Sequence, residues 1–328
     1  MNKVNCRMLV ILFAFILSIL FFSGCLLSDQ QSLEYTFGVN SDGTSDFTSI
    51  SEAIAHAQDH DIIFVHNGLY EENLVINKSI HLIGENKFST ILDGNGEGTV
   101  ISITADGVKV THFTIQNSGS KSTYYEMDAG VNSNASTVQV SNCICNNTTV
   151  GLQVKNANEN RLDNNLLQNN LYGIFLFHSS YNTIDNNLVE SNSYYGCYLY
   201  SGSNKNQLSD NLFVDNKYGV RIKSEQNQVI QNLFRDNIRG VWFCCGAKNN
   251  TVYHNTFVNN TENNGRDNFN ENKWYHPQLG GNYWDNYYGN DTDSDGFGDT
   301  SYIVDQTSAG RIIAEDTMPL LQPTKDFD

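Results

Sequence analysis

The sequence predicts an all-β protein: a right-handed parallel β-helix with turns of about 22 residues, an N-terminal capping helix and an acidic loop in its C-terminal cap. Three observations support this prediction: a glycine period, an alternation of apolar residues, and asparagines that keep the same register. The glycines recur at intervals of 21 to 23 residues, at Gly130, Gly151, Gly173, Gly196, Gly219 and Gly240. A fixed period of this length is the mark of a solenoid.

The residues after each glycine alternate as in a strand with one buried face. One step after the glycine stand Leu152, Ile174, Cys197, Val220 and Val241, and three steps after it stand Val154, Leu176, Leu199, Ile222 and Phe243. Each repeat also holds an Asn-Leu strand start and a short apolar run before the next asparagine. The Asn and Gly bends separate about three short strands per turn. Helices are not expected in this region, because no run has 3.6-residue periodicity and β-branched and aromatic residues dominate.

The asparagines are predicted to stack from turn to turn as hydrogen-bonded ladders. Asn165, Asn187, Asn211, Asn232 and Asn255 share one repeat position, and Asn169, Asn192, Asn216, Asn237 and Asn259 share a second. Asparagine tolerates the left-handed backbone of a tight bend. At an inter-strand spacing of ~4.8 Å, its amides can also bond along the stack. The role of these residues is therefore structural.

Residues 1–24 are predicted to be a secretory signal peptide. Lys3 and Arg7 precede an apolar run over residues 8–22, which is short for a membrane span. The run ends in Phe-Ser-Gly-Cys, which is similar to a lipobox, so we expect lipid attachment to Cys25 and a tether over residues 25–34. The alternative is an uncleaved N-terminal anchor. In both cases the bulk of the chain lies outside the cytoplasm, anchored to the cell membrane.

The β-helix itself is expected over residues 35–264, with regular repeats over 130–260 and a C-terminal cap over 265–328. A helix over residues 48–58 is predicted because Ser49 and Glu52 form a capping-box pattern and the apolar residues fall on one face. This helix would cover the open apolar end of the solenoid. The expected early strands are residues 62–65, 74–76, 80–83, 99–103 and 108–115.

Charge and cysteine content exclude several classes of partner and fold. The chain has 36 acidic and 19 basic residues, a net charge of -17, which argues against nucleic acid and anionic membrane surfaces as partners. Five cysteines remain after Cys6 and Cys25, and an odd number does not indicate a disulfide framework. Cys197 is expected in the core. Two pairs, Cys143 with Cys145 and Cys244 with Cys245, are candidates for metal binding or for pairing.

Two stretches carry a family resemblance. They are residues 46–86, and residues 281–304 (GNYWDNYYGNDTDSDGFGDTSYIV) followed by Met318-Pro319-Leu320. They resemble the opening and the C-terminal signature of NosD-like β-helix surface proteins, and with the repeats the resemblance covers nearly all of the mature chain. It implies a pectin-lyase-like right-handed β-helix, in a family with carbohydrate-binding and sugar-modifying relatives.

The resemblance also implies two activities that the residues do not support. The family name implies a periplasmic accessory of copper-site assembly, but the four Met and eight His are scattered through the chain. Copper is therefore not supported by the sequence itself. Pectin methylesterases open similarly, but their paired catalytic aspartates have no recognisable match here.

The sharpest chemical motif is an acidic loop of Asp291, Asp293, Asp295 and Asp299 around Gly296. Alternating carboxylates with a glycine at the bend match the start of a calcium loop. Counting from Asp291, position twelve is Tyr302, so the loop is not an EF-hand; Asp305 or backbone carbonyls would complete the shell. We expect a structural Ca²⁺ that orders the cap. The alternative is a solvated acidic loop.

A candidate ligand-binding face follows from the outward positions of the same strands. Two steps after each glycine stand Gln153, Phe175, Tyr198, Arg221 and Trp242, and four steps after it stand Lys155, Phe177, Tyr200, Lys223 and Cys244. We expect the aromatic residues among them to be exposed and to stack on sugar rings, with Arg221 and Lys223 meeting acidic groups. Two alternatives remain: the rings pack against one another or under a long loop, or they form a protein contact.

The function predicted from the sequence is non-catalytic binding of a polysaccharide or envelope glycan. A first alternative, a polysaccharide-modifying lyase, hydrolase or epimerase, predicts acids or bases converging on the aromatic face. A second, a copper or metal-cofactor assembly accessory, predicts converging cysteines or histidines. A third is a structural envelope protein, which predicts no soluble ligand.

Overall fold

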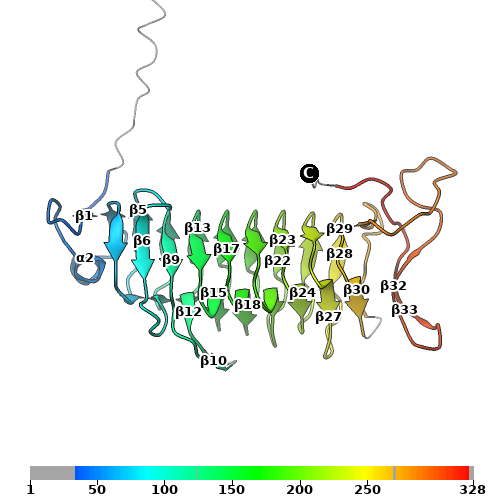
Figure 1. Ribbon diagram of the computed structural model, residues 1–328, viewed down its shortest axis with the longest axis horizontal. Coiled ribbons are helices and arrows are strands. Elements are labelled where there is room, and N and C mark those ends of the chain that lie inside the picture. Colours follow the sequence, from blue (N-terminus) through cyan, green and yellow to red (C-terminus); the bar gives the residue numbers. More distant parts are fainter. Residues whose placement is uncertain (1–33, 124, 269–270, 325–328) are drawn as a thin grey trace, which may run out of the picture. The chain divides into compact units, whose positions relative to one another are not determined.

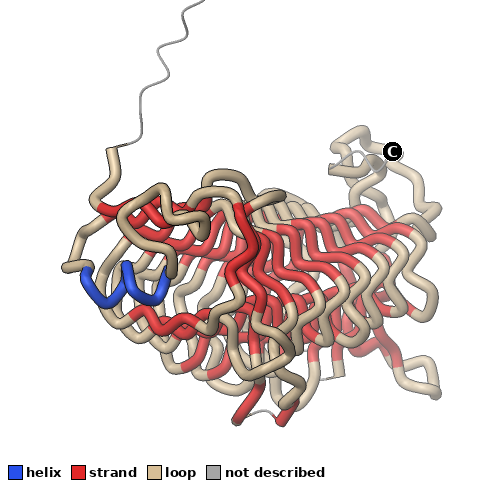
Figure 2. Tube along the Cα trace, turned by 60° about the vertical axis from the view of Figure 1, so that its left-hand side comes forward, coloured by secondary structure: helices blue, strands red, loops and turns tan. Residues whose placement is uncertain are grey.

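A computed structural model describes residues 34–123, 125–268 and 271–324, and residues 35–328 form one compact unit. The unit is a parallel β-helix whose successive turns stack side by side (Figure 1). Each regular turn contributes one short strand to each of three sheets, and a strand in one turn pairs with the equivalent strand of the next. The tube view shows these parallel strands along the solenoid, with the helix at its N-terminal end (Figure 2).

The three sheets, here called A, B and C, account for most strands in the described part of the chain. Sheet A contains β1 (Phe37–Val39), β2 (Ile62–Val65), β5 (His81–Gly84), β8 (Lys109–Thr111), β13 (Gln139–Ser141), β16 (Arg161–Asp163), β19 (Thr183–Asp185), β22 (Gln207–Ser209), β25 (Gln228–Ile230) and β28 (Thr251–Tyr253). Sheet B contains β3 (Gly68–Tyr70), β6 (Thr90–Asp93), β9 (Thr114–Gln116), β14 (Ile144–Asn146), β17 (Leu166–Gln168), β20 (Leu188–Glu190), β23 (Leu212–Val214), β26 (Leu233–Arg235), β29 (Thr256–Val258) and β31 (Tyr283–Trp284). Sheet C contains β4 (Leu74–Ile76), β7 (Ile101–Ile103), β12 (Ala129–Ser133), β15 (Val150–Lys155), β18 (Tyr172–Phe177), β21 (Tyr195–Leu199), β24 (Tyr218–Ile222), β27 (Arg239–Phe243) and β30 (Asn263–Asp267).

Two antiparallel pairs lie outside these sheets: β10 (Ser122–Thr123) with β11 (Glu126–Met127), and β32 (Tyr302–Gln306) with β33 (Ile312–Asp316). The early strands confirm the predicted ones with small shifts. The segment predicted as one strand over residues 108–115 is two strands, β8 and β9, because the chain bends at His112, whose φ is 65°.

The predicted capping helix is α2 (Ile50–His56), which buries Ile50, Ala53 and Ile54. Ser49 is its N-cap, and the Ser49 side chain accepts a hydrogen bond from the Glu52 N–H. The N-terminal N–H groups find a second partner outside the helix, because the Glu72 carboxylate accepts from Ile50 N at 2.9 Å. No helix in the described residues is long and apolar enough to cross a membrane.

The apolar residues after each glycine line the inside of the solenoid, and Cys197 is fully buried among them as expected. The glycine period has a steric cause. A Cβ added at Gly196 would lie 2.6 Å from the carbonyl oxygen of Gly219 in the next turn, and the same close approach recurs along the row. Any side chain at this position would push two turns apart.

Asparagine ladders are present at all three bends of the turn. In the first, the Nδ2 of each residue donates to the Oδ1 of its equivalent one turn later, along Asn165, Asn187, Asn211, Asn232, Asn255 and Asn282. In the second the members are Asn170, Asn192, Asn216, Asn237 and Asn260. The third, not predicted as a ladder, runs along Asn182, Asn206, Asn227, Asn250 and Asn272.

The prediction of the second ladder was wrong at its two ends. Asn169 and Asn259 were assigned to it, but both have positive φ values of 55° and 56° and form the bend itself. Their neighbours Asn170 and Asn260 take the ladder positions. The double Asn-Asn at both places made the register ambiguous from the sequence.

Candidate ligand-binding face

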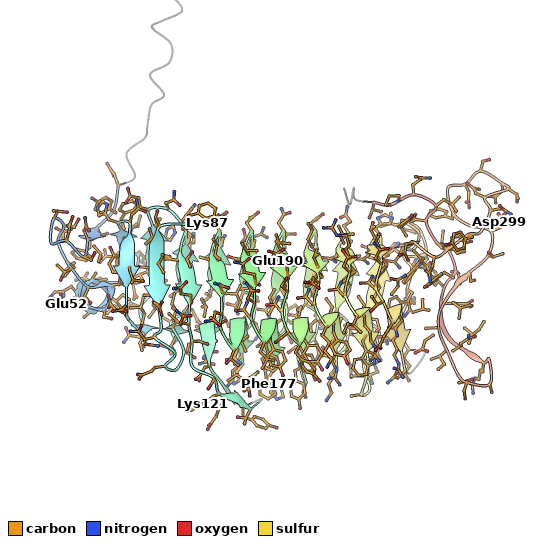
Figure 3. All side chains as sticks on the ribbon, viewed as in Figure 1. Glu52, Lys87, Lys121, Phe177, Glu190 and Asp299 are labelled. Atoms are coloured by element: carbon orange, nitrogen blue, oxygen red, sulfur yellow. The ribbon has the colours of Figure 1, made fainter. Side chains whose placement is uncertain are left out.

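The outer face of sheet C brings the predicted row together in register. The strand pairing aligns Gln153 with Phe175, Phe175 with Tyr198, Tyr198 with Arg221, and Arg221 with Trp242. Arg266 of β30 continues the row beyond Trp242. In Figure 3, Phe177 lies at the side of the solenoid where the strands of sheet C run.

The expectation that all these aromatic rings are exposed was wrong for three of them. Phe175, Tyr198 and Phe177 are only 0%, 1% and 7% exposed. They form a second apolar cluster outside the solenoid core, together with Met127, Ala129, Val150, Tyr172 and Tyr195. The alternative in which the rings pack against one another describes this half of the face.

The loop that carries β10 and β11 contributes to this burial. The Tyr125 ring meets the Phe177 ring edge-on, with centroids 5.7 Å apart, and Lys155 Nζ donates to the Tyr125 carbonyl at 2.8 Å. Phe175 and Tyr198 meet at 5.6 Å, also edge-on. Such contacts are the preferred geometry of aromatic pairs, and they turn the rings toward each other rather than toward solvent.

The C-terminal half of the face remains half-exposed and combines aromatic rings with cations. The Tyr218 and Trp242 rings are stacked, with centroids 5.5 Å apart and an interplanar angle of 30°. Lys223 Nζ lies over the Tyr200 ring at 4.7 Å. Tyr218 was missed by the sequence analysis, although the repeated Tyr-Gly pair at 172–173, 195–196 and 218–219 was visible and places a tyrosine row beside the predicted one.

Arg221 lies at the centre of this half. Its guanidinium carbon is 4.4 Å from the Trp242 ring centroid and 5.1 Å from the Tyr198 ring centroid. Arg221 Nη1 donates to the Tyr195 hydroxyl, and Nε donates to Cys244 Sγ at 3.3 Å. These contacts hold the planar guanidinium in one place.

The charge of Arg221 is not neutralised by its neighbours. Burial and a hydrogen bond with Tyr194 raise the pKa of Tyr195 above its ordinary value, so this phenol is neutral. Burial and the hydrogen bond with Cys245 raise the pKa of Cys244 to about 11, so it is a neutral thiol at pH 7. Among the ion pairs of the described residues none includes Arg221.

The other arginines on this face do have carboxylate partners. Arg239 Nε donates to Glu262 at 2.6 Å, and Arg266 lies 3.9 Å from Asp305. Both guanidinium groups also approach the Trp242 ring, at 5.3 and 5.9 Å. Trp242 is therefore surrounded by three cations, of which Arg221 alone has no acid within ion-pair distance in the described part of the chain.

Two carboxylates beside the C-terminal half of the face, Glu225 and Glu262, do not form a catalytic pair with each other. Glu225, the acid nearest Lys223 in the sequence, lies 3.6 Å from Lys248, and Glu262 is bound to Arg239. A general acid and a general base would have to face each other across the bound sugar. Glu225 and Glu262 instead neutralise basic neighbours.

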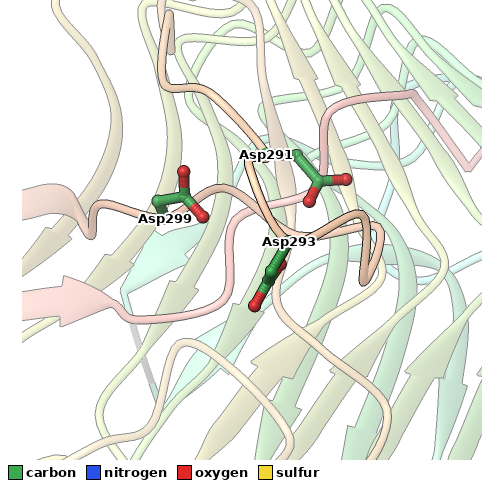
Figure 4. Close-up of side chains that lie close together, drawn as sticks. All are labelled: Asp291, Asp293 and Asp299. Atoms are coloured by element: carbon green, nitrogen blue, oxygen red, sulfur yellow. The ribbon is translucent and has the colours of Figure 1, made fainter.

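The acidic loop brings three of its four predicted ligands together (Figure 4). Asp291, Asp293 and Asp299 each offer a carboxylate oxygen within 4.8 Å of the others, so the triad could hold a metal ion. Asp295 lies outside the triad and accepts a hydrogen bond from the Phe297 N–H at 2.9 Å. Asp305, considered as a further ligand, contacts Arg266 and the backbone of Asp267 instead.

The one metal-ligating cluster of three or more side chains among the described residues does not offer the ligands of a copper centre. Copper sites use soft sulfur ligands and imidazoles. The acidic triad, the one group of three or more metal-ligating His, Cys, Asp or Glu found among the described residues, offers only oxygen. Cys143 and Cys145 are fully buried, and burial raises the pKa of both thiols, to about 12 for Cys143. The predicted lipidation residue, Cys25, lies outside the described residues.

Comparison with solved structures finds the same β-helix fold in other proteins. The chain is similar to the structure of XylC with xylose, with a TM-score of 0.55 at 10% identity over 70% of this chain and 67% of that one. It is also similar to alginate lyase from Paenibacillus sp. str. FPU-7, with a TM-score of 0.51 at 12% identity over 71% of this chain and 94% of that one. Likeness at such identities shows the fold alone.

At the level of sequence, no curated protein matches the chain. Residues 72–289 match the family model described as periplasmic copper-binding protein (NosD). The match spans more than half of the 328 residues and includes all the regular turns. The chain therefore belongs to the NosD family.

Proposed function

We propose that this NosD-family β-helix is a non-catalytic binder of an acidic polysaccharide, and that the ligand lies on the outer face of β24 and β27. One observation carries the proposal. Arg221 is a fixed cation without a carboxylate partner among the described residues, and it lies over the half-exposed ring of Trp242, which is itself stacked with the half-exposed ring of Tyr218.

The aromatic pair supports a sugar as the ligand. Flat rings with an accessible face pack against the apolar faces of sugar rings. The stacked Tyr218 and Trp242 stand on neighbouring turns, so their spacing is set by the strand repeat. A chain of sugars laid along the solenoid axis would meet both rings in succession.

The cations support an acidic sugar. Arg221 lies in β24, Lys217 directly precedes that strand and Lys223 directly follows it, and none of the three has an ion-pair partner among the described residues. In a protein with a net charge of -17, this local positive surface would attract anions and orient them. The guanidinium fork of Arg221 suits the planar carboxylate of a uronic acid.

The proposal is tested by titrating the purified chain with an acidic polysaccharide, such as polygalacturonate, and with a neutral polymer of comparable length. Lys223→Gln and Trp242→Ala should each weaken binding of the acidic polymer at least several-fold. Lys109→Gln is the matched control, because it removes the same charge from an exposed position on β8 of sheet A.

Two outcomes would refute the proposal. One is equal affinity for the acidic and the neutral polymer. The other is equal loss of binding in Lys223→Gln and Lys109→Gln, because it would mean that net charge, rather than the face, governs binding. Continued turnover of the polymer during the titration, seen as new chain ends, would favour the alternative of a polysaccharide-modifying enzyme.

We also propose that the acidic triad binds Ca²⁺ in a structural role. Carboxylate oxygens are the ligands that Ca²⁺ prefers, and Gly296 turns the chain sharply with a φ of 92°. The loop is linked to the rest of the cap, because Gly298 N donates to the Pro319 carbonyl at 2.9 Å. A Ca²⁺ ion bound by the three carboxylates would therefore order the segment that covers the C-terminal end of the solenoid.

For the location, we propose that the chain is held outside the cytoplasm by a lipid on Cys25. The description of the family as periplasmic agrees with this compartment. Labelling cells with a radioactive fatty acid should mark the wild-type chain and leave Cys25→Ser unmarked. Equal labelling of both chains, or of neither, would contradict the anchor.

A further inference from the structure

Two adjacent cysteines mark the end of β27, at the edge of the binding face. Cys244 and Cys245 place their Sγ atoms 3.1 Å apart. Cys244 is buried, whereas Cys245 is exposed on a turn where its φ is 59°. The other cysteines of the described residues, Cys143, Cys145 and Cys197, are all buried.

The surroundings of the two thiols differ in a way that favours one as a nucleophile. Partial burial of Cys245 acts to raise its pKa, but the hydrogen bond with Cys244 and the charges of Lys223 and Arg221 outweigh it, so the pKa lies below its ordinary value. The pKa of Cys244 is raised to about 11, chiefly because this thiol is buried. Because the thiolate is the reactive form, Cys245 reacts first.

We infer that Cys244 and Cys245 form a site of reversible thiol–disulfide exchange, whose substrates are low-molecular-weight disulfides. In the first step the Cys245 thiolate attacks one sulfur of the disulfide RSSR, forms a mixed disulfide and releases RS⁻. In the second step Cys244 loses its proton to solvent, attacks the sulfur of Cys245 and releases the second RS⁻. With the protons taken up by the leaving groups, two protein thiols and one RSSR become one protein disulfide and two RSH.

The geometry makes the product bond easy to reduce. Consecutive Cα atoms are ~3.8 Å apart, below the ~4.4 Å lower limit of ordinary disulfides. A bond between adjacent cysteines is therefore strained, and strained, exposed disulfides are the labile and regulatory ones. The two sulfurs are already close, since a separation of 3.1 Å must shorten only to ~2.05 Å.

The site can be tested on the full, folded chain without any glycan. The chain is reduced, desalted and exposed to oxidised glutathione, and the remaining thiols are then alkylated in denaturant. Trypsin cleaves after Arg239 and Lys248, so one peptide, residues 240–248, contains both cysteines and no other. We expect this peptide to lose two hydrogen atoms and to recover them with dithiothreitol, while the peptides of the three buried cysteines stay reduced.

Two variants separate the roles of the thiols. Cys244→Ser should stop at the mixed disulfide, so that glutathione stays attached to Cys245. Cys245→Ser should be at least tenfold slower than the wild type, since the buried Cys244 must then react alone. Reactivity of the buried Cys197 serves as the control for folding in both variants.

A measurement on the wild type alone completes the test. The rate of Cys245 alkylation by iodoacetamide should rise with pH around a midpoint below that of free cysteine. The inference fails if the peptide stays reduced in the folded chain while the denatured chain reacts. It also fails if Cys245→Ser, with Cys197 still protected, reacts as fast as the wild type.

Discussion

Removing one amide from the middle of an asparagine ladder should destabilise the solenoid strongly. In Asn211→Ala, four hydrogen bonds are lost. Asn211 Nδ2 donates to the Ile184 carbonyl and to Asn232 Oδ1, and Asn211 Oδ1 accepts from the backbone N–H and the side chain of Asn187, all at 2.9 Å. The Asn187 side chain keeps two other carbonyl acceptors, but its backbone N–H has no second acceptor among the described residues.

The expected cost follows from these losses. A buried donor left without a partner costs about 1–3 kcal/mol, and each of the other three bonds contributes a net ~1 kcal/mol. The sum is about 4–6 kcal/mol in the free energy of unfolding, less any relaxation of the bend around the smaller side chain. This is large for a single substitution, because most cost about 1 kcal/mol.

The assay is urea denaturation combined with hydrogen exchange at the Asn187 amide, because a solenoid need not unfold in one step. The matched control is Asn186→Gly, one residue before the ladder, at an exposed bend with a φ of 57° that glycine accepts freely. It should change stability by no more than about 0.5 kcal/mol. A cost below about 1 kcal/mol for Asn211→Ala, with unchanged exchange protection of Asn187, would refute the reasoning.

Three further predictions concern the row of glycines and the C-terminal cap. Gly196→Ala should unfold the β-helix or separate two of its turns, because the new Cβ would lie 2.6 Å from the Gly219 carbonyl oxygen. Circular dichroism should show a fall in the melting temperature that is far larger than the fall caused by a Gly→Ala change at an exposed position. Saturating Ca²⁺ should raise the melting temperature of the wild type by about 5 °C and leave the double variant Asp291→Asn with Asp293→Asn unchanged; equal shifts in both would contradict calcium binding by the triad. Burial raises the pKa of Asp316 from 3.8 to about 6, so the folded chain holds this proton more tightly than the unfolded chain, and the stability it contributes is lost as the pH rises through about 6. Between about pH 4 and pH 7, the free energy of unfolding of the wild type should fall by about 2 kcal/mol relative to that of Asp316→Asn; a parallel pH dependence of the two would be contrary evidence.

The fold was predictable because each turn repeats the same physical demands. The apolar row must fill the solenoid, the glycine must admit the next turn's carbonyl oxygen, and the ladder asparagine must bond both neighbouring turns. These demands produce a repeat in the sequence that is visible without any related sequence for comparison. The predicted register of the ladder was wrong only where two asparagines stand together, as at Asn169 and Asn170. Asparagine fits both the left-handed bend position and the ladder position, so the sequence does not say which of the two residues takes which.

The candidate site was predictable in its alignment but not in its exposure. The repeat correctly placed Phe175, Tyr198, Arg221 and Trp242 in one outward row. Outward from the core is not the same as open to solvent, because neighbouring rings and the loop carrying Tyr125 cover part of the row. That loop interrupts the repeat, so its path across the face has no periodic signal in the sequence.

The buried half of the face also has a consequence for the open half. Tyr198 and Tyr195 pack in the outer apolar cluster, and both contact the guanidinium of Arg221 from one side, while Trp242 contacts it from the other. Arg221 is therefore held before any ligand arrives, and a bound anion would not have to order it. Since ordering a long side chain costs about 0.5–1.5 kcal/mol, this fixed position strengthens binding without adding a contact. Tyr198, which was expected to touch the glycan, would then support glycan binding together with Tyr195 through the arginine that the two tyrosines hold in place.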